Sequence, residues 1–315
     1  MKAVTDRSWA MNNRLREPEL PPPCSNSGKA HPPIAAGHWQ DIARQWDRVG
    51  PPLRPSPQDV AFCVDAVRRR AGDNGPPRVL ILGVTPELYR LPWPGGTDVL
   101  AVDHTPSMIE AVWPGPREAA ICEDWTAVRL AASSRDLVLC DGGIHLLAYP
   151  EGHRGLIRKL RHVVAPGGLC VFRLFIPPPQ RESHEAVLQD LLSGKIANVN
   201  VLKLRLAMAL QEDAVRGVEL HRVWEAVHQV APDFDRLAGR LDWPIEHLLA
   251  FNTYRDCRIR YCFLSVAEVS HLFCGDPGGF HLDAVMAPTY ELGERCPTVV
   301  LRRGGPDAME RDRPQ

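Results

Sequence analysis

The chain has 315 residues, of which 44% are hydrophobic and 24% are charged, as is usual for a soluble globular protein. Its 37 Lys and Arg residues are balanced by 38 Asp and Glu residues, giving a net charge of -1. This balance provides no global basic field to hold a phosphate backbone, so we expect no nucleic-acid partner. No apolar run approaches the roughly 18 residues of a membrane span, and the N-terminus lacks the apolar segment of a signal peptide. We therefore expect a cytoplasmic protein that does not bind a membrane.

Nine cysteines are scattered along the chain, and none of them forms a Cys-x-x-Cys pair. Their odd number and their spacing favour reduced thiols over a disulfide framework or a zinc ribbon. His221, Glu225 and His228 would share one helical face, but no second pair of ligands accompanies them, so a solvated face is favoured over a metal site. We therefore expect no bound metal.

The two ends of the chain differ in composition from the middle. Residues 1–36 are rich in proline and small polar residues and are expected to form a mobile leader; residues 304–315 are expected to form a mobile tail. Residues 37–77 are expected to form N-terminal helices. The first helix is predicted over 38–49, and the second begins after Ser56, with Asp59 placed to complete its cap.

Strand and helix signals alternate from residue 78 onward. Five apolar runs predict buried strands, and helical patterns lie between some of them. The strands are expected at 79–82, 98–102, 118–122, 137–140 and 169–175. This pattern predicts an α/β fold with a doubly wound, mostly parallel sheet, whose core spans 78–180.

Residues 181–250 interrupt this alternation. They carry three or four helical patterns and no strand signal, so we expect a helical insertion after the fifth strand that serves as a lid, a substrate-binding element or a dimerisation surface. The α/β signals return in residues 251–303, where Ser265 and Glu268 predict a capping box. Further strands are expected there at 281–286 and 298–301, and they would complete the core sheet.

Polar residues follow the predicted strands where each of them ends. They are Gly83, Thr85 and Glu87 after the first, Asp103 at the second, Asp124 and Trp125 after the third, and Asp141 and Gly142 at the fourth. In open α/β sheets, ligands bind outside the carboxyl ends of the strands, and an acidic residue roughly 20 residues after the first glycine binds ribose hydroxyls. The series therefore predicts a nucleoside-binding site.

The chain resembles the class I, Rossmann-like methyltransferases that depend on S-adenosylmethionine (SAM), over 78–175 and, more loosely, 262–303. The resemblance is carried by VLILG from Val79, AVDHTPSM from Ala101, CEDW from Cys122, DLVLCDG from Asp136 and LRHVVAPGG from Leu160. The last piece is the most family-specific, and its Pro-Gly-Gly turn needs a positive φ. The resemblance implies a doubly wound, seven-stranded sheet, SAM as cofactor and S-adenosylhomocysteine as product.

The resemblance also implies roles for the residues at the adenosine end. Asp103 would accept hydrogen bonds from both ribose hydroxyls. His104 and Met108 would flank the adenine. Asp124 would accept a hydrogen bond from the adenine amino group, and Trp125 would lie against the adenine ring. The alternative for Asp103 is a helix cap, and the alternative for Trp125 is plain core packing.

At the methionine end, Gly83 would let the backbone approach the cofactor, and Asp141, followed by Gly142, would lie beside the transferred methyl group. The alternative for Asp141 is a turn residue. The family's first motif is usually richer in glycine than this one. Thr85 or Glu87 would then hold the amino group of SAM, or the departure would weaken the site.

Methyl transfer is a direct displacement in which the enzyme mainly aligns the reacting atoms and excludes water. A base is needed only if the acceptor must lose a proton. His145, near the end of the fourth strand, is the first candidate for a catalytic role, and a core or capping histidine is the alternative. Tyr149, Tyr254 and His104 are weaker candidates.

The acceptor pocket is expected to come from outside the core. The insertion 181–250 can cover the cleft, and the first helix, with Trp39 and Trp46, can fold over the cofactor site together with Arg54 of the following connector. The alternative for this helix is packing on the outer face of the sheet.

The leading functional hypothesis is a methyltransferase acting on an oxygen or nitrogen atom of a small-molecule acceptor in specialised metabolism. A second hypothesis keeps SAM but gives non-methyl chemistry such as cyclisation, and a third is a non-catalytic, methyltransferase-like scaffold. A nicotinamide-dependent oxidoreductase is disfavoured because the glycines that a pyrophosphate requires are missing. A homodimer through the insertion is a further expectation.

Overall fold

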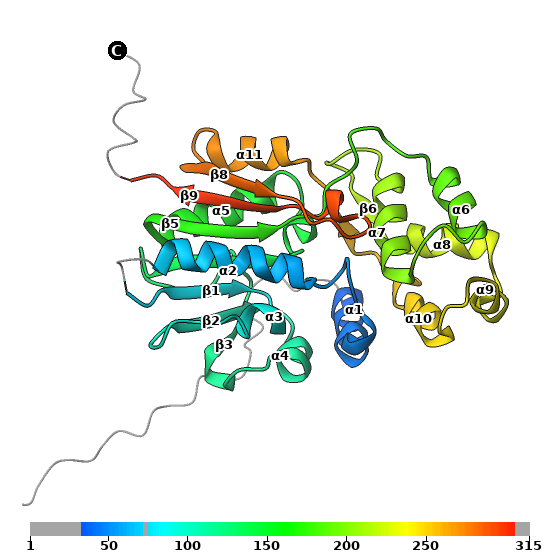
Figure 1. The fold of residues 1–315 in the computed structure, drawn as a ribbon, viewed down its shortest axis with the longest axis horizontal. Coiled ribbons are helices and arrows are strands. Elements are labelled where there is room, and N and C mark those ends of the chain that lie inside the picture. The colour runs from blue at the N-terminus through cyan, green and yellow to red at the C-terminus, as the bar shows by residue number, and fades with distance from the viewer. Residues whose placement is uncertain (1–32, 72–74, 306–315) are drawn as a thin grey trace, which may run out of the picture.

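The computed structural model describes residues 33–71 and 75–305. Most of the predicted leader and tail therefore lies outside the described residues. The described part contains a sheet with helices on both faces and, beside it, a separate block of helices (Figure 1).

The central sheet has seven strands in the order β3-β2-β1-β4-β5-β9-β8. They are β1 (Arg78–Leu82), β2 (Asp98–Asp103), β3 (Ala120–Cys122), β4 (Arg135–Asp141), β5 (Val164–Arg173), β8 (Phe280–Met286) and β9 (Thr298–Arg303). The pairs from β3 to β5 are parallel, and β9 runs antiparallel to both of its neighbours. The predicted doubly wound, mostly parallel sheet is confirmed.

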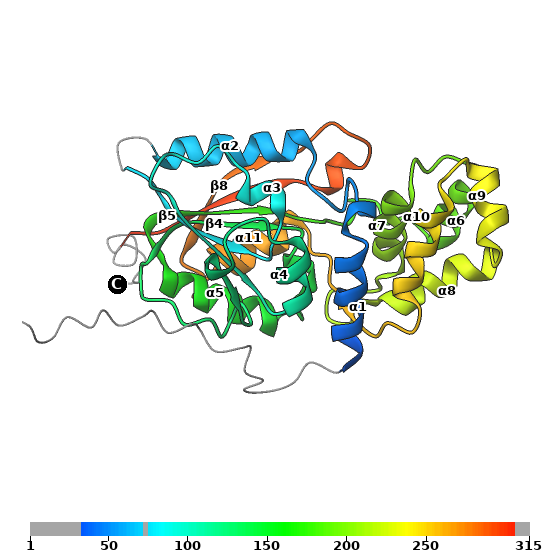
Figure 2. The same ribbon diagram turned by 90° about the horizontal axis from the view of Figure 1, so that it is seen from below.

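Two layers of helices cover this sheet, and α2 (Pro57–Ala71) and α5 (Glu151–Val163) lie on opposite faces (Figure 2). Successive side chains of a strand point to opposite faces. Accordingly, Val79 and Ile81 pack in the cluster of α2 and α4 (Pro106–Val112), whereas Leu80 and Leu82 pack in the cluster of α5 and α11 (Val266–Cys274). The continuous apolar runs of the sequence are thus explained by burial on both faces.

The N-terminal helices differ in their bounds from the prediction. α1 (Pro33–Arg44) begins before the expected start at residue 38, so the end of the expected leader is helical; proline suits the first turn of a helix because its missing N–H is not needed there. The expected last turn of this helix is instead the short helix η1 (Trp46–Arg48). The cap of α2 is confirmed, since Ser56 N donates to Asp59 Oδ2 at 2.8 Å.

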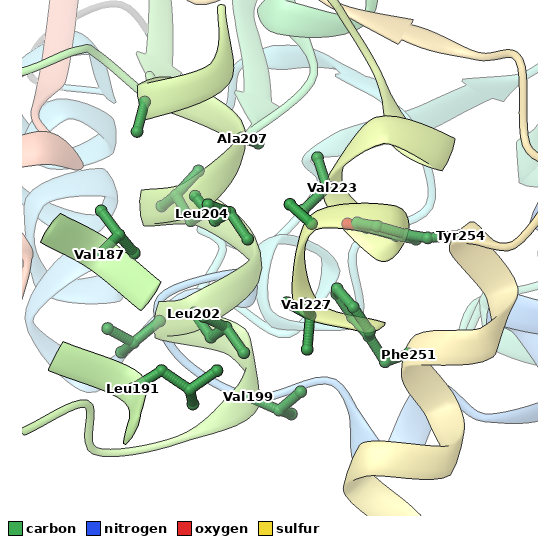
Figure 3. Packing of buried hydrophobic residues seen from close by; sticks show 14 of the residues in the cluster. Val187, Leu191, Val199, Leu202, Leu204, Ala207, Val223, Val227, Phe251 and Tyr254 are labelled. Atoms are coloured by element: carbon green, nitrogen blue, oxygen red, sulfur yellow. The ribbon is translucent and has the colours of Figure 1, made fainter. Parts of the chain in front are cut away.

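The helical insertion is confirmed as a block with its own apolar core. It consists of α6 (His184–Leu192), α7 (Val199–Leu210), α8 (Leu220–Val230), α9 (Phe234–Leu241), α10 (Ile245–Leu249) and the short helix η5 (Ala250–Tyr254). Figure 3 shows Leu202 and Leu204 of α7 packed among side chains of α6, α8 and η5. The expectation of no strand in this segment is wrong. β6 (Val218–Glu219) pairs with β7 (Arg260–Tyr261), and two residues are too short to give a sequence pattern.

The remaining elements connect these parts. They are α3 (Pro86–Tyr89), η3 (Arg117–Ala119), η4 (Ile144–Leu146) and η6 (Gly293–Arg295). The capping box of Ser265 and Glu268 is present at the start of α11. Gly167 has the expected positive φ, 74°, within β5. Free thiols are found at Cys63, Cys140, Cys170, Cys257, Cys262, Cys274 and Cys296. None of the described helices is long and apolar enough to cross a membrane.

Candidate active site

One cavity lies at the carboxyl ends of β1, β2 and β4, where the sheet meets α1 and the helical block. Its core side is lined by Gly83, Thr85, Asp103, His104, Met108, Asp124, Trp125, Asp141, Gly142 and His145. Its other side is lined by Trp39, Ile42 and Trp46 near the N-terminus, and by Lys203, Tyr254 and Tyr261. The structure therefore brings together every predicted cofactor residue except Glu87. It also places the first helix over the strand ends rather than on the outer face of the sheet (Figure 1).

Asp103 lies at the end of β2 and is only 9% exposed. Its Oδ1 accepts a hydrogen bond from the backbone N of Thr105 at 2.8 Å, so it caps the turn before α4 while it lines the cavity. Burial raises the pKa of this carboxyl group to about 6, although hydrogen bonds from Thr105 act in the opposite direction. At neutral pH the group is an ionised acceptor in a weakly hydrated site.

Trp125 is fixed by contacts within the protein while it lines the cavity. Its Nε1 donates to the carbonyl oxygen of Val102 at 2.8 Å. Its ring lies directly against Gly143, where an added Cβ would be only 2.6 Å from a ring carbon. The preceding Asp124 accepts a hydrogen bond from the backbone N of Thr126 at 2.7 Å. The core-packing alternative and the cavity position thus both apply to Trp125.

Gly83 follows β1 with a φ of 92°, a conformation that side chains other than glycine rarely adopt. Its N donates to the carbonyl oxygen of Val102 at 2.8 Å. An added Cβ at Gly83 would meet no protein atom within 4 Å. The backbone here therefore borders open space inside the cavity, as a ligand that approaches the chain closely requires.

Glu87 is not brought into this cavity. Its Oε1 accepts hydrogen bonds from Arg54 Nε at 3.0 Å and Nη2 at 2.5 Å. The Arg54 guanidinium also lies 5.0 Å from the ring centre of Trp46. Arg54 and Glu87 thus tie the connector after η1 to α3, the short helix after β1. Of the two residues predicted to hold the amino group of SAM, only Thr85 lines the cavity.

Asp141 forms a buried ion pair with Arg173, the last residue of β5. Arg173 Nη1 also donates to the carbonyl oxygen of Pro52 at 2.7 Å. Burial raises the pKa of Asp141, and the charge of Arg173 opposes this shift. Arg173 is not among the predicted site residues, although an arginine within the apolar run of the fifth strand is a signal of a buried ion pair.

His145 lies in a cluster of aromatic rings. Its ring centre lies 5.0 Å from the ring centre of Phe175, 4.5 Å from that of Tyr261 and 5.5 Å from that of Phe263. Its Nδ1 is buried and has no hydrogen-bond partner within the described protein. Burial lowers the pKa of His145 to about 3, so the ring is neutral near pH 7 and is a weak base.

The helical block contributes Lys203 and Tyr254 to the cavity, and the short strand β7 that follows it contributes Tyr261. Tyr254 and Tyr261 are buried, and their side chains are hydrogen-bonded to each other. Lys203 Nζ lies 5.1 Å from the ring centre of Tyr254. Lys203 and Tyr261 are not among the predicted site residues, although a lysine inside the apolar sequence of α7 is a signal of a special role. The other weak candidate, Tyr149, is not among the lining residues; its ring contacts His153.

The cavity has features that suit SAM. A carboxylate, open space beside a glycine backbone and an apolar wall that includes Met108 are found together, and the buried Trp46 Nε1 has no hydrogen-bond partner among the described residues. No group of three or more His, Cys, Asp or Glu residues that could hold a metal occurs within 33–71 and 75–305.

Residues 82–172 match a family model described as a methyltransferase domain. The match runs from the last residue of β1 through β2, β3 and β4 into β5, and the sheet order is that of the class I fold. Residues 82–172 therefore belong to a methyltransferase domain with the class I sheet order. The match does not extend to α1 or the helical block.

Solved structures resemble the chain over most of its length. A candidate zinc-dependent alcohol dehydrogenase from Rhodobacter sphaeroides has 13% identity and a TM-score of 0.57, with 86% of this chain and 98% of that chain covered. The CcbJ methyltransferase from Streptomyces caelestis has 15% identity and a TM-score of 0.49, with 85% and 98% covered. N-methyltransferase NodS from Bradyrhizobium japonicum WM9, in complex with S-adenosylhomocysteine, has 11% identity and a TM-score of 0.46, with 85% and 100% covered. At these identities the likeness concerns the fold alone. Among curated proteins no match is found.

Proposed function

We propose that the chain transfers the methyl group of SAM to an oxygen or nitrogen atom of a small-molecule acceptor, in the cytoplasm and in specialised metabolism. One observation carries this proposal: the strand-end residues and the rings of Tyr254 and Tyr261 line the same cavity. Because α1 and the block enclose the strand ends, the cavity suits a small acceptor better than a polymer. The NodS and CcbJ methyltransferases are similar in fold.

In this proposal the adenosine part of SAM lies at the β2 and β3 ends. The Asp103 carboxylate accepts hydrogen bonds from the ribose hydroxyls with the oxygen atoms that Thr105 leaves available. Met108, Trp125 and His104 enclose the adenine, and Asp124 accepts a hydrogen bond from the adenine amino group. Trp125 is held for this by its hydrogen bond to the backbone of β2.

The methionine part lies at the β1 and β4 ends. When bound, SAM supplies a methyl group on a sulfonium sulfur, which makes the methyl carbon electrophilic. The Gly83 and Gly142 backbones allow close approach, and the Thr85 hydroxyl accepts a hydrogen bond from the amino group. Asp141, whose position is fixed by its ion pair with Arg173, lies beside the same group.

The acceptor lies among the rings of His145, Tyr254 and Tyr261. Because burial keeps His145 neutral, its role in this proposal is to hold the acceptor by a hydrogen bond rather than to take its proton. The walls that α1 and the block provide exclude water from the reacting atoms.

Isothermal titration calorimetry with SAM, followed by mass spectrometry of reactions with phenols and amines, tests this function. We expect SAM binding that Asp103→Ala removes and Glu110→Ala, an exposed acid on α4, preserves. A methylated acceptor with S-adenosylhomocysteine supports methyl transfer, whereas methylthioadenosine indicates non-methyl chemistry on SAM. No binding of SAM would instead support the scaffold.

A homodimer through the helical block belongs to the same proposal. Val230 of α8 and Leu249 of α10 are 40% and 50% exposed, and burying apolar surface of this kind against a partner is favourable. Light scattering after size exclusion checks it: we expect twice the mass of one chain, and a monomer at all concentrations would contradict this part.

A further inference from the structure

Lys203 is a buried cation in the wall of the cavity. It lies on α7, is 5% exposed and is flanked by Leu202 and Leu204, which pack into the core of the block (Figure 3). None of the acidic side chains in the described chain forms an ion pair with it. Its Nζ lies 5.6 Å from the ring centre of Phe251 and 5.1 Å from that of Tyr254.

Burying an ammonium group without an opposite charge is unfavourable, and the contact with aromatic rings offsets only part of that cost. Burial accordingly lowers the pKa of Lys203 to about 8, a value at which the group is still mostly protonated at pH 7. A leucine or methionine at this position of an apolar helix would avoid the cost. The lysine thus indicates an anion that the cavity receives from outside the chain.

The other charged and titratable groups around Lys203 do not supply this anion. His38 faces it from α1, and burial lowers the pKa of His38 to about 4, so that ring is neutral. Burial also keeps His145 neutral. The Asp141 carboxylate in the same cavity is already paired with Arg173.

A continuous series of rings joins Lys203 to the β4 end of the cavity. Phe175 lies against Gly142, where an added Cβ would be 2.7 Å from its ring. From Phe175 the series continues through His145 and Tyr261 to Tyr254, beside Lys203. A flat ring fits between such side chains, because aromatic groups pack well against one another in offset or edge-to-face arrangements.

We propose that the acceptor is an aromatic carboxylate, and that Lys203 selects it by pairing with the carboxylate while the rings hold its aromatic part. This inference rests on the function proposed above, since it places the acceptor in the same cavity as SAM. Lys203 is thereby a specificity-determining residue contributed by the helical block, and the methyltransferase domain alone lacks it.

Calorimetric titration of the full chain, saturated with S-adenosylhomocysteine, tests this with benzoate and benzamide as probes at pH 7. The two compounds have nearly the same shape, and only benzoate carries a charge. We expect benzoate to bind about tenfold or more tightly than benzamide, as a hydrogen bond between charged groups implies. Lys203→Met should remove this preference and Lys203→Arg should keep most of it. Lys195→Met changes an exposed lysine of the same block and should leave the preference intact.

Titrations at higher pH give a second measurement that needs no variant. The preference for benzoate should fall as the pH rises through about 8, where Lys203 loses its proton. Equal binding of both probes, binding of neither, or a preference that Lys203→Met retains overturns the inference while the proposed function stands. If the wild-type chain does not bind S-adenosylhomocysteine, both fall.

Discussion

Asp141 and Arg173 are paired twice, as neighbours across β4 and β5 and as an ion pair between their side chains. Their side chains are 7% and 3% exposed. Arg173 also binds the carbonyl oxygen of Pro52, in the connector that follows η1. This pair therefore joins the strand ends that line the cavity to the segment that covers them.

Arg173→Met should destabilise the protein strongly. The substitution leaves the Asp141 carboxylate buried without its partner, and breaking a buried pair in this way costs about 3–5 kcal/mol. We expect a drop of this size in the free energy of unfolding, measured by chemical denaturation. Arg154→Ala, which breaks the exposed pair with Glu151, should cost less than about 1 kcal/mol.

A double substitution separates the buried charge from the lost contacts. Arg173→Met combined with Asp141→Asn should recover part of the lost stability, because the remaining amide is uncharged. A double variant that is less stable than Arg173→Met would contradict this account of the pair.

SAM affinity should depend on pH through Asp103. The ionised carboxylate accepts the ribose hydrogen bonds, and its pKa in the free protein is raised to about 6 by burial. Affinity measured by calorimetry should therefore increase as the pH rises from 5 to 7 and level off above. Asp103→Asn should bind about ten to a hundred times more weakly at pH 7, with a flatter profile over this range. An unchanged profile in this variant would exclude Asp103 as the titrating group.

The same carboxyl group affects stability with the opposite sign. Its pKa in the folded protein lies above the unfolded value of about 3.9, so the native state binds the proton more tightly. The contribution to stability is thus complete below about pH 4 and is lost as the pH rises to about 6, by roughly 3 kcal/mol in total. The free energy of unfolding, measured by urea denaturation and plotted against pH, should have different slopes for wild type and Asp103→Asn over this range. Above it the two curves should run parallel.

The sequence predicts the part of the site that local patterns determine. Asp103, Trp125 and Asp141 follow buried strands, and parallel strands bring their carboxyl ends to one edge of a sheet. Long-range pairing is not visible in such patterns. Glu87 was expected to face the cofactor, but Arg54 lies far from it in sequence and binds it in the fold. The position of Lys203 likewise follows from how the helical block packs against the sheet.

Element bounds were predictable only where a cap or a sufficiently long apolar pattern marks them. The helix caps that begin at Ser56 and Ser265 are present as expected. By contrast, β6 has only two residues and is stabilised by pairing with β7 far along the chain. A segment of that length has no periodicity from which a strand could be predicted.

Gly83 and Gly167 provide a matched pair for testing the approach of SAM to the backbone. Both have positive φ, 92° and 74°, and an added Cβ at either would meet no protein atom within 4 Å. Substitution by alanine should therefore cost similar stability, about 1–2 kcal/mol from backbone strain, as measured by denaturation. Only Gly83→Ala should weaken SAM binding, because its Cβ enters the cavity. Equal SAM affinities in the two variants would contradict the placement of the methionine part beside Gly83.

Gly143→Ala tests whether the fixed position of Trp125 matters for the cofactor. Gly143 has an ordinary φ of -94°, so the substitution introduces no backbone strain. Its Cβ would, however, lie 2.6 Å from both Cys140 Sγ and the Trp125 ring, so the ring must shift and its hydrogen bond to Val102 weaken. We expect a loss of about 1–3 kcal/mol in unfolding free energy and weaker SAM binding.

Gly155→Ala is the control for this substitution, since its Cβ on α5 would meet its nearest neighbour at an ordinary 3.4 Å. It should leave SAM affinity unchanged and hold or raise stability, because alanine favours the helix. Trp125→Phe removes the hydrogen bond and keeps an aromatic ring, so its SAM affinity should fall less than that of Gly143→Ala if ring position dominates. If Trp125→Phe binds SAM more weakly than Gly143→Ala, the indole group itself, rather than its placement by Gly143, contributes most of the binding at the adenine.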